Sequence, residues 1–360
     1  MQSSFRLLVV RLGAMGDILH ALPAVAALRR AHPAWQIGWV VDPRWQALLK
    51  AGVREQGSGV SESRGPQMPL VDRLHFAATR DWKRHPLGLQ TRSQLAALRR
   101  ELREARYNTV LDLQGAIRSA AIARLSGCLR RIGEAKPREW PAQWLYTEPI
   151  ATRGAHVIEQ DVELAAAVAG DPLAVVPPPL PVDTEAENWC DAWLAAHAES
   201  SGVKPLAFLA PGAGWGAKRW PPERYAAVAK GLIARGFQVL VNAPTGEESL
   251  AAPIAAAGAA PVTATLPQLI ALTRRIALSI AGDTGPLHLA CALGRPVVGV
   301  YGPTDPSRNG PFGTRARVLR SPVSPRDYSH RDAPDPGLLT ISPEDVLKAS
   351  DELMAEEKTA

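Results

Sequence analysis

Short apolar runs that end in glycine-containing turns and lead into helical runs recur along this chain, and this alternation constrains its fold most. The first example is the run Leu7–Val10, the turn "RLGAMGD" and a helical run from Ala24 to Arg30. Strands that alternate with helices form parallel sheets with both faces covered, so the pattern predicts an α/β fold. In such sheets the turns after the strands meet at one edge, where ligands bind.

The alternation is interrupted once and then starts again, which predicts two domains. The stretch "GDPLAVVPPPLPVDTE" contains a proline run that neither a helix nor a central strand accepts, and "PLAFLAPGAG" restarts the strand–turn pattern. We expect Rossmann-like, doubly wound domains at residues 1–175 and 176–341, facing each other across a cleft. Residues 342–360 form a C-terminal helix, capped by Ser342 ahead of Pro343, that we expect to pack back on the first domain.

Composition narrows the class of partner without selecting one. The net charge of +6 favours anionic partners such as phosphates, acidic sugars or a membrane face, although a protein with slightly basic surfaces explains it equally well. The three cysteines are far apart and belong to no cluster, which argues against disulfides and zinc and favours the cytoplasm. No signal peptide or spanning segment is recognisable, so any membrane contact is expected to be peripheral.

The strongest local signal is "GDTGPLHLA", where a strand ends and a helix begins. The amides of Thr284, Gly285 and Leu287 are positioned to bind an anion at the helix N-terminus. Asp283 and His288 flank the same turn. A capping role explains one of these polar residues but not the whole group, so we interpret the turn as a binding site.

Two further strand-end turns precede it in the second domain. In "APGAGWGAKRWPPERY" three glycines let a phosphate approach the backbone around Ala213 and Gly214, and Lys218 supplies a positive charge. The turn lacks the GK[ST] ending of a Walker loop. In "NAPTGEE", Glu247 is either a ribose contact or an ordinary acidic residue at a helix start.

The first domain carries two comparable turns and a basic region. Asp17 follows "GAMG", whose GxxG spacing is not the GxGxxG of dinucleotide-binding proteins, and an N-cap is the simple alternative role for this acid. "DLQGAIRSA" places Gln114 and Arg118 at the other turn. Basic side chains between Arg80 and Arg103 indicate an acidic substrate or an anionic surface, or else a solvated helix face.

Five motifs taken together resemble one enzyme family. "RLGAMGDILHALPAV", "VLDLQGAIRSA", "PGAGWGAKRWP", "GDTGPLHLA" and "VYGPTDP" resemble the bacterial ADP-heptose:lipopolysaccharide heptosyltransferases (glycosyltransferase family 9), in the same order over nearly the whole chain. The first motif looks most like the heptosyltransferase I branch, which acts on Kdo of Kdo2–lipid A, and heptosyltransferase II remains open. The resemblance implies a GT-B fold, with the acceptor bound by the first domain and the nucleotide sugar by the second.

The resemblance also implies a mechanism and partners. Heptose leaves its ADP donor with inversion, without a metal or other cofactor, at the cytoplasmic face of the inner membrane, with which the enzyme associates peripherally. Asp17 takes the place of the general base, and Lys218 stabilises the leaving group. The donor contacts fall on Ala213, Gly214, Lys218, Glu247, Asp283, Thr284, Gly285 and His288. The acceptor contacts fall on Gly13, Ala14, His20, Gln114 and Arg118.

The sequence differs from the family pattern in one motif, and two other functions remain as alternatives. Where some family members carry a pair of threonines, this chain has Ala213 and Gly214, so backbone amides must replace hydroxyl groups. The stretch from Arg54 to Pro69 looks longer than in the family and is expected to form a mobile loop that alters acceptor access. The rivals are a nucleotide-dependent oxidoreductase, which the missing GxGxxG disfavours, and a non-catalytic protein that binds nucleotide sugars.

Overall fold

The computed structural model describes residues 5–49, 69–197, 204–327 and 329–357. The chain divides into two compact units, Met1–Pro181 and Val182–Ala360. The division falls inside the proline-rich linker, slightly after the expected boundary at residue 175. Most of the stretch from Arg54 to Pro69 lies outside the described residues, so its expected role in acceptor access is left as a prediction.

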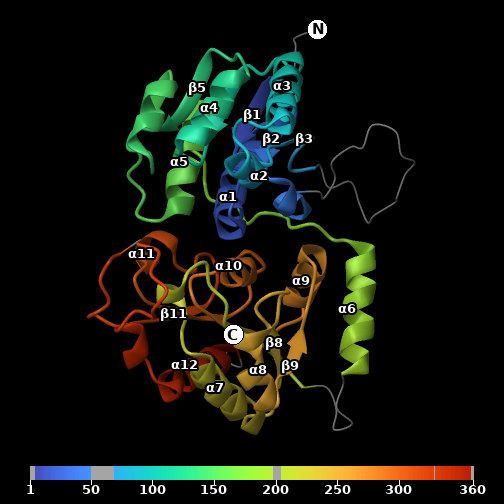
Figure 1. The fold of residues 1–360 in the computed structure, drawn as a ribbon, viewed down its shortest axis with the longest axis vertical. Helices are drawn as coiled ribbons and strands as arrows, with labels where there is room; N and C mark the ends of the chain where they lie inside the picture. Colours follow the sequence, from blue (N-terminus) through green and yellow to red (C-terminus); the bar gives the residue numbers. More distant parts are fainter. Residues whose placement is uncertain (1–4, 50–68, 198–203, 328, 358–360) are drawn as a thin grey trace. The chain divides into compact units, whose positions relative to one another are not determined.

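The first unit is built on a parallel sheet with the strand order β3-β2-β1-β4-β5-β6 (Figure 1). Its strands are β1 (Arg6–Val10), β2 (Gln36–Val41), β3 (Arg73–Phe76), β4 (Thr109–Asp112), β5 (Arg130–Glu134) and β6 (Glu148–Ile150). The chain winds outward from β1 in one direction and then from β4 in the other. This is the doubly wound order of Rossmann-like domains, as predicted.

Helices cover both faces of this sheet because alternate strand residues point to opposite sides. Leu8 and Val10 pack with Leu98 and Ile122 on the face covered by α3 and α4, while α1 and α5 pack together on the other. The helices of the unit are α1 (Met15–Ala31), α2 (Thr79–Arg84), α3 (Leu89–Glu104), α4 (Ile117–Leu125) and α5 (Val157–Ala169), with 3₁₀ helices η1 (Pro43–Leu48) and η2 (Trp140–Leu145).

Helix α1 begins earlier than the sequence suggests and runs through Pro23. The expected helical run covered only residues 24–30, because a proline removes one helical hydrogen bond and its ring crowds the preceding turn. The helix is buried over most of its length, and packing offsets that local cost.

The second unit repeats the topology of the first. Its strand order is β12-β11-β10-β7-β8-β9, and every pairing is parallel. The strands are β7 (Leu206–Ala210), β8 (Gln238–Asn242), β9 (Ala260–Val262), β10 (Leu278–Ala281), β11 (Val297–Tyr301) and β12 (Ala316–Arg320). Numbered from β7, this is again the order 3-2-1-4-5-6, read from the other edge.

The C-terminal helix α12 (Pro343–Glu357) packs within the second unit, which differs from the expectation that it packs back on the first domain. Val346, Ala349 and Leu353 join a core that contains Val228 and Leu232 of α7. The apolar side of α12 is therefore buried in the core of the second unit. The other helices are α6 (Thr184–Ala196), α7 (Pro222–Ala234), α8 (Glu248–Ala256), α9 (Leu266–Thr273), α10 (Gly285–Ala292) and α11 (Pro306–Asn309), with η3 (Gly216–Lys218) and η4 (Leu338–Thr340).

Among the described residues, no helix is both long enough and apolar enough to cross a membrane.

Candidate active site

Each sheet has a point where its winding direction reverses, and the turns at that point border the crevice where doubly wound proteins bind ligands. In the first unit these turns follow β1 and β4, and in the second they follow β7 and β10. Most of the residues singled out in the sequence occupy these four turns. Glu247 follows β8, next to β7 in the second sheet.

A buried hydrogen bond joins the two turns of the first unit. The Leu12 amide donates to Oε1 of Gln114 at 2.9 Å, and only 7% of Gln114 is exposed. Gln114 was predicted to contact the acceptor, but in the structure its carbonyl oxygen holds the turn after β1 beside the turn after β4. Any contact of Gln114 with the acceptor substrate would therefore come from its side-chain NH2 group.

Asp17 lies in the first turn of α1, at the third helical position rather than at the N-cap, which is Ala14. Its Oδ2 accepts the Ala14 amide at 2.9 Å, and its Oδ1 lies 3.1 Å from Nη2 of Arg11. The Asp17 side chain remains 37% exposed, whereas that of Arg11 is 8% exposed. A carboxylate has about four acceptor positions, so these two contacts leave room for a substrate hydroxyl.

The backbone before Asp17 is shaped by a tryptophan. Gly13 has a φ of +150°, and a Cβ added there would lie 2.6 Å from Nε1 of Trp45. The glycine therefore allows the turn to pass close over the indole ring of η1. Ala14 is exposed beside it, with its amide already donated to Asp17.

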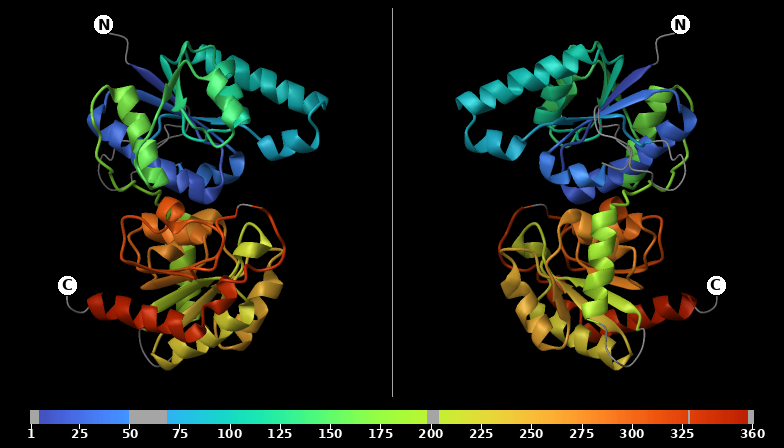
Figure 2. Two further views of the ribbon diagram at one scale, coloured as in Figure 1. Left: turned by 90° about the vertical axis from the view of Figure 1, so that its left-hand side faces the viewer. Right: turned by 90° about the vertical axis from the view of Figure 1, so that its right-hand side faces the viewer.

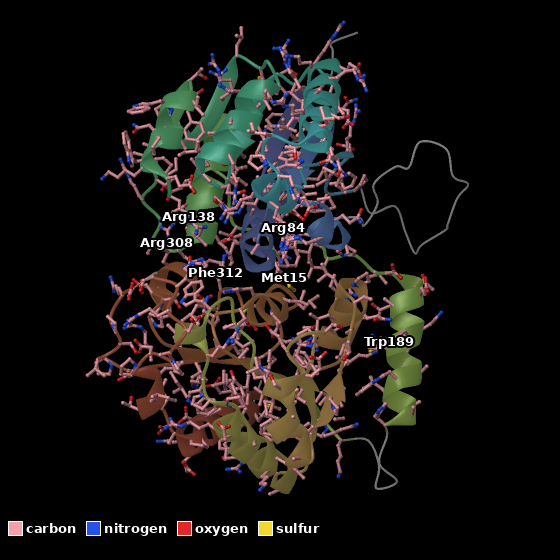
Figure 3. The ribbon with its side chains drawn as sticks, in the orientation of Figure 1. Met15, Arg84, Arg138, Trp189, Arg308 and Phe312 are labelled. Atoms are coloured by element: carbon pink, nitrogen blue, oxygen red, sulfur yellow. The ribbon has the colours of Figure 1, made fainter. Side chains whose placement is uncertain are left out.

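The remaining predicted acceptor residues lie in different surroundings. His20 is buried, and its ring meets the ring of His156 edge to face at 5.6 Å. Arg118 is exposed on the first turn of α4. Arg138, labelled in Figure 3, belongs to the segment that packs against Gly115, and the adjacent Glu139 accepts the Ile117 amide at 2.8 Å.

Asp112 is a residue whose importance the sequence analysis missed. It is fully buried at the end of β4 and accepts four hydrogen bonds, from the amides of Gln114 and Gly115 and the hydroxyls of Ser119 and Tyr146. Burial raises the pKa of Asp112, and the four donors oppose that rise. Asp112 fixes the turn that presents Gln114, and its partner Tyr146 lies too far along the chain for a local motif to reveal.

The two turns of the second unit are joined by an ion pair. Lys218 Nζ lies 2.6 Å from Oδ2 of Asp283, and His288 Nε2 lies 3.0 Å from Oδ1 of the same residue. The side chains of Lys218, Asp283 and His288 are 10%, 11% and 6% exposed. In the sequence, Lys218 belongs to one turn and Asp283 and His288 to another, but in the structure the three side chains form one network.

The network keeps Asp283 ionised. Burial alone raises the pKa of a carboxyl group, but the hydrogen bond from His288 and the charge of Lys218 outweigh it and hold the pKa of Asp283 well below its usual range. Lys218 therefore keeps an anionic partner throughout the neutral pH range. Its ammonium group is fixed at the end of β10 instead of moving as a free surface charge.

Unused hydrogen-bond donors surround this network. Thr284 Oγ1 and Trp215 Nε1 are buried and have no hydrogen-bond partner within the described part of the chain. Thr284 is the N-cap of α10, so the amides of Gly285 and Leu287 lie in a first turn that has no helical acceptors. The arrangement matches what an anionic ligand requires.

Trp215 is a second residue that the sequence analysis did not assign, although it lies inside the "GAGWGAK" motif. Lys218 Nζ lies 4.4 Å from the centre of its ring, and the ring stacks on His330 at 4.4 Å with an interplanar angle of 10°. The lysine is thus held between a carboxylate and an aromatic face.

The other residues predicted to contact the nucleotide sugar lie in or against the glycine turn after β7. A Cβ added at Gly212 would lie 2.2 Å from Oε2 of Glu247, so the Glu247 carboxylate packs directly on the backbone of the glycine turn. Ala213 accepts a hydrogen bond from Arg219 at 3.4 Å, and Gly214 is exposed. Glu247 is the N-cap residue of α8 and makes no side-chain capping hydrogen bond.

Comparisons with known proteins agree with this architecture. The chain matches the sequence profile of glycosyltransferase family 9 (heptosyltransferase) over residues 95–335, which include Lys218 and Asp283 but not Asp17. Lipopolysaccharide heptosyltransferase 1 of Pseudomonas aeruginosa is 28% identical over 323 residues, 86% of this chain and 81% of that protein. Lipopolysaccharide heptosyltransferase 2 of Salmonella typhimurium is 27% identical over 380 residues, 98% of this chain and 99% of that protein.

Among solved structures, the E. coli heptosyltransferase WaaC with ADP has a TM-score of 0.76 at 23% identity, covering 97% of this chain and 100% of that one. The fold is therefore GT-B, with two Rossmann-like units, as the resemblance implied. Because the family profile spans more than half of the 360 residues, this chain belongs to glycosyltransferase family 9, the heptosyltransferase family.

Proposed function

We propose that this enzyme transfers L-glycero-D-manno-heptose from ADP-heptose to Kdo of Kdo2–lipid A, in the assembly of the lipopolysaccharide inner core. The observation that carries the proposal is the buried Lys218–Asp283–His288 network, with the unpartnered Thr284 hydroxyl beside it. Two solved structures of WaaC, one with ADP and one with ADP-2-deoxy-2-fluoro heptose, support an ADP-sugar as the donor.

The second unit holds the donor in this mechanism. The Thr284 hydroxyl and the first-turn amides of α10 bind the pyrophosphate, while Lys218 balances the charge that develops on departing ADP. Asp283 accepts from heptose hydroxyls and keeps Lys218 in place. Glu247 is positioned for the ribose hydroxyls, and His288 for the sugar or a phosphate. This chain's own cation and amides supply the stabilisation, so we propose that transfer needs no metal.

The first unit supplies the base. Asp17 takes the proton from the acceptor hydroxyl as that oxygen forms a bond to C1 of the heptose, while the bond between C1 and the pyrophosphate oxygen breaks. ADP leaves from the opposite side of C1, and the anomeric configuration inverts. The exposed part of the Asp17 carboxylate is available for this contact, and the Ala14 amide and Arg11 fix its position.

The choice of the first heptose rests on the "RLGAMGDILHALPAV" stretch. Relatives named heptosyltransferase 1 and heptosyltransferase 2 are 28% and 27% identical to this chain, which leaves addition of the second heptose as the alternative. We also propose that the enzyme works in the cytoplasm, bound peripherally to the inner membrane, because the acceptor is a lipid.

The test is to incubate purified protein with ADP-heptose and a panel of Kdo1, Kdo2 and heptosyl-Kdo2 acceptors, with and without excess chelator, and to weigh the products by mass spectrometry. We expect one heptose to be added to the Kdo acceptors, with no loss of activity in chelator. Product only on heptosyl-Kdo2 would assign the second step. Binding of ADP-heptose without any product would assign a non-catalytic role, and activity that requires added Mg²⁺ would overturn the metal-free mechanism.

A further inference from the structure

The helical hairpin formed by α2 and α3 projects from the first unit (Figure 2, cyan). Its tip carries exposed apolar side chains. Leu87 is 77% exposed and Leu89 is 84% exposed. They are separated only by Gly88: Leu87 lies in the short turn between the two helices, and Leu89 is the first residue of α3. Two neighbouring leucines held this far out of a core leave apolar surface in water that a binding partner would bury.

The turn that exposes these leucines is well ordered by hydrogen bonds. The His85 carbonyl accepts both the Gly88 amide at 3.1 Å and the Thr91 hydroxyl at 2.7 Å. At the base of the hairpin, Nε1 of Trp82 donates to Oε1 of Gln94 at 2.7 Å, which joins the two helices. These contacts hold Leu87 and Leu89 away from the core.

Basic side chains surround the leucines. Arg80, Lys83, Arg84 and Arg92 are all exposed, and no ion pair with another described residue neutralises any of them. Arg84 ends α2 and is labelled in Figure 3, and Arg92 lies one turn into α3. The single acid between residues 79 and 92 is Asp81. The tip therefore combines an apolar point with an excess of positive charge.

We propose that the tip of the α2–α3 hairpin docks on an anionic lipid bilayer, with Leu87 and Leu89 inserted at the headgroup boundary and the surrounding basic side chains bound to lipid phosphates. Buried apolar area and attraction to anionic lipid together give the binding energy of such interfacial segments. The biological purpose rests on the proposed function, because a lipid-linked acceptor requires the enzyme at the membrane surface.

Leu129 provides a matched control because it is similarly exposed but lacks the charged surroundings. It is 86% exposed in the first unit, and the two arginines that follow it are engaged: Arg130 pairs with Glu148 at 2.8 Å, and Arg131 donates to the carbonyls of Leu145 and Cys128. If any exposed leucine promoted vesicle binding regardless of its surroundings, Leu129 would contribute as much as Leu87 or Leu89.

The test is sedimentation with vesicles made of phosphatidylethanolamine and phosphatidylglycerol, without donor or acceptor. We expect the full-length protein to bind these vesicles and to bind phosphatidylcholine vesicles at least tenfold more weakly. The double variant Leu87→Ser/Leu89→Ser should lower the partition coefficient about tenfold or more, and Arg84→Glu should lower it severalfold, whereas Leu129→Ser should leave it unchanged.

Turnover of a soluble, deacylated Kdo2 acceptor by the double leucine variant separates this proposal from the proposed function. We expect this turnover to match that of the unmodified protein, and turnover of acceptor embedded in vesicles to fall. Unchanged vesicle binding by the double variant, or equal loss with Leu129→Ser, would overturn the docking surface whatever the enzyme's activity. Failure of both proteins to use any acceptor would instead count against the proposed function.

Discussion

At the scale of single residues, the proposed donor site depends on a lysine whose charged group is held in place by its neighbours. Lys218 contacts the Asp283 carboxylate at 2.6 Å and the face of Trp215 at 4.4 Å, and its side chain is 10% exposed. A cation held in place before the reaction stabilises developing negative charge without first reorganising solvent. The ion pair also ties the turn after β7 to the turn after β10.

Replacing Lys218 with methionine tests this role. We expect kcat to fall by about 10²–10³, the loss typical for removal of one group that stabilises transition-state charge. The assay is release of ADP at a temperature where thermal melting shows the variant to be folded. The exposed Lys230 of α7 is the control, since Lys230→Met removes the same charge outside the site. A folded Lys218→Met variant with unchanged kcat would show that Lys218 serves only the ion pair with Asp283.

At the scale of structural elements, the recurring unit is a strand, a turn and a helix, and buried side chains fix each turn. The turn after β4 shows this most clearly, because Asp112 collects four donors from the turn, from α4 and from Tyr146. The position of the Gln114 side chain, which holds the turn after β1, depends on these hydrogen bonds to Asp112. The site in the first unit is therefore supported by a buried polar network.

Asp112→Ala should destabilise the first unit by roughly 3–5 kcal/mol, because it leaves several buried donors without an acceptor. Tyr146→Phe removes only one of the four donors and should cost about 1–2 kcal/mol. Urea unfolding followed by tryptophan fluorescence measures both. A loss below about 1 kcal/mol for Asp112→Ala would mean that water or a rearranged turn satisfies these donors.

The alternation of strands and helices was readable from the sequence because buried parallel strands are continuous apolar runs. Leu7–Val10, for example, was predicted almost to the residue, and β1 spans Arg6–Val10. The strands β5 and β12 cannot be read in this way, because their sequences, "RRIGE" and "ARVLR", place arginines where an apolar run is expected. Helix α1 was shortened in the prediction because Pro23 argues locally against a helix that tertiary packing permits.

For the predicted site residues too, the local sequence pattern does not reveal contacts that form only in the folded chain. Lys218, Asp283 and Thr284 were chosen as candidates because they lie in or beside glycine-containing turns after strands, and His288 because it follows in the first turns of α10; the structure brings Lys218, Asp283 and His288 together. Their mutual contacts were not predictable, since residues 218 and 283 meet only through the strand order. His156 beside His20 and Tyr146 below Asp112 were missed for that reason, and neither belongs to a local motif.

At the scale of the whole molecule, the two units share one topology and one way of building a site. In each, a side chain joins the two turns at the point where the winding reverses: Gln114 bonds the Leu12 amide in the first, and Lys218 pairs with Asp283 in the second. The first site offers a carboxylate, and the second offers a cation with unused donors. This division matches a reaction in which one half activates an acceptor and the other stabilises a leaving group.

The central claim is that the Asp17 carboxylate is the base of the transfer reaction. Asp17→Asn keeps an oxygen that can accept the Ala14 amide, so α1 should begin as before, but the variant has no carboxylate to take a proton. Arg11→Met is the matched control, because it removes the ion pair and leaves the carboxylate.

The decisive measurement is kcat for heptose transfer to Kdo2–lipid A, paired with the Kd for ADP measured by calorimetry. The account predicts that Asp17→Asn lowers kcat by about 10²–10⁴ with an unchanged Kd for ADP, and that Arg11→Met retains most of its activity. Near-normal kcat in a folded Asp17→Asn variant would contradict it.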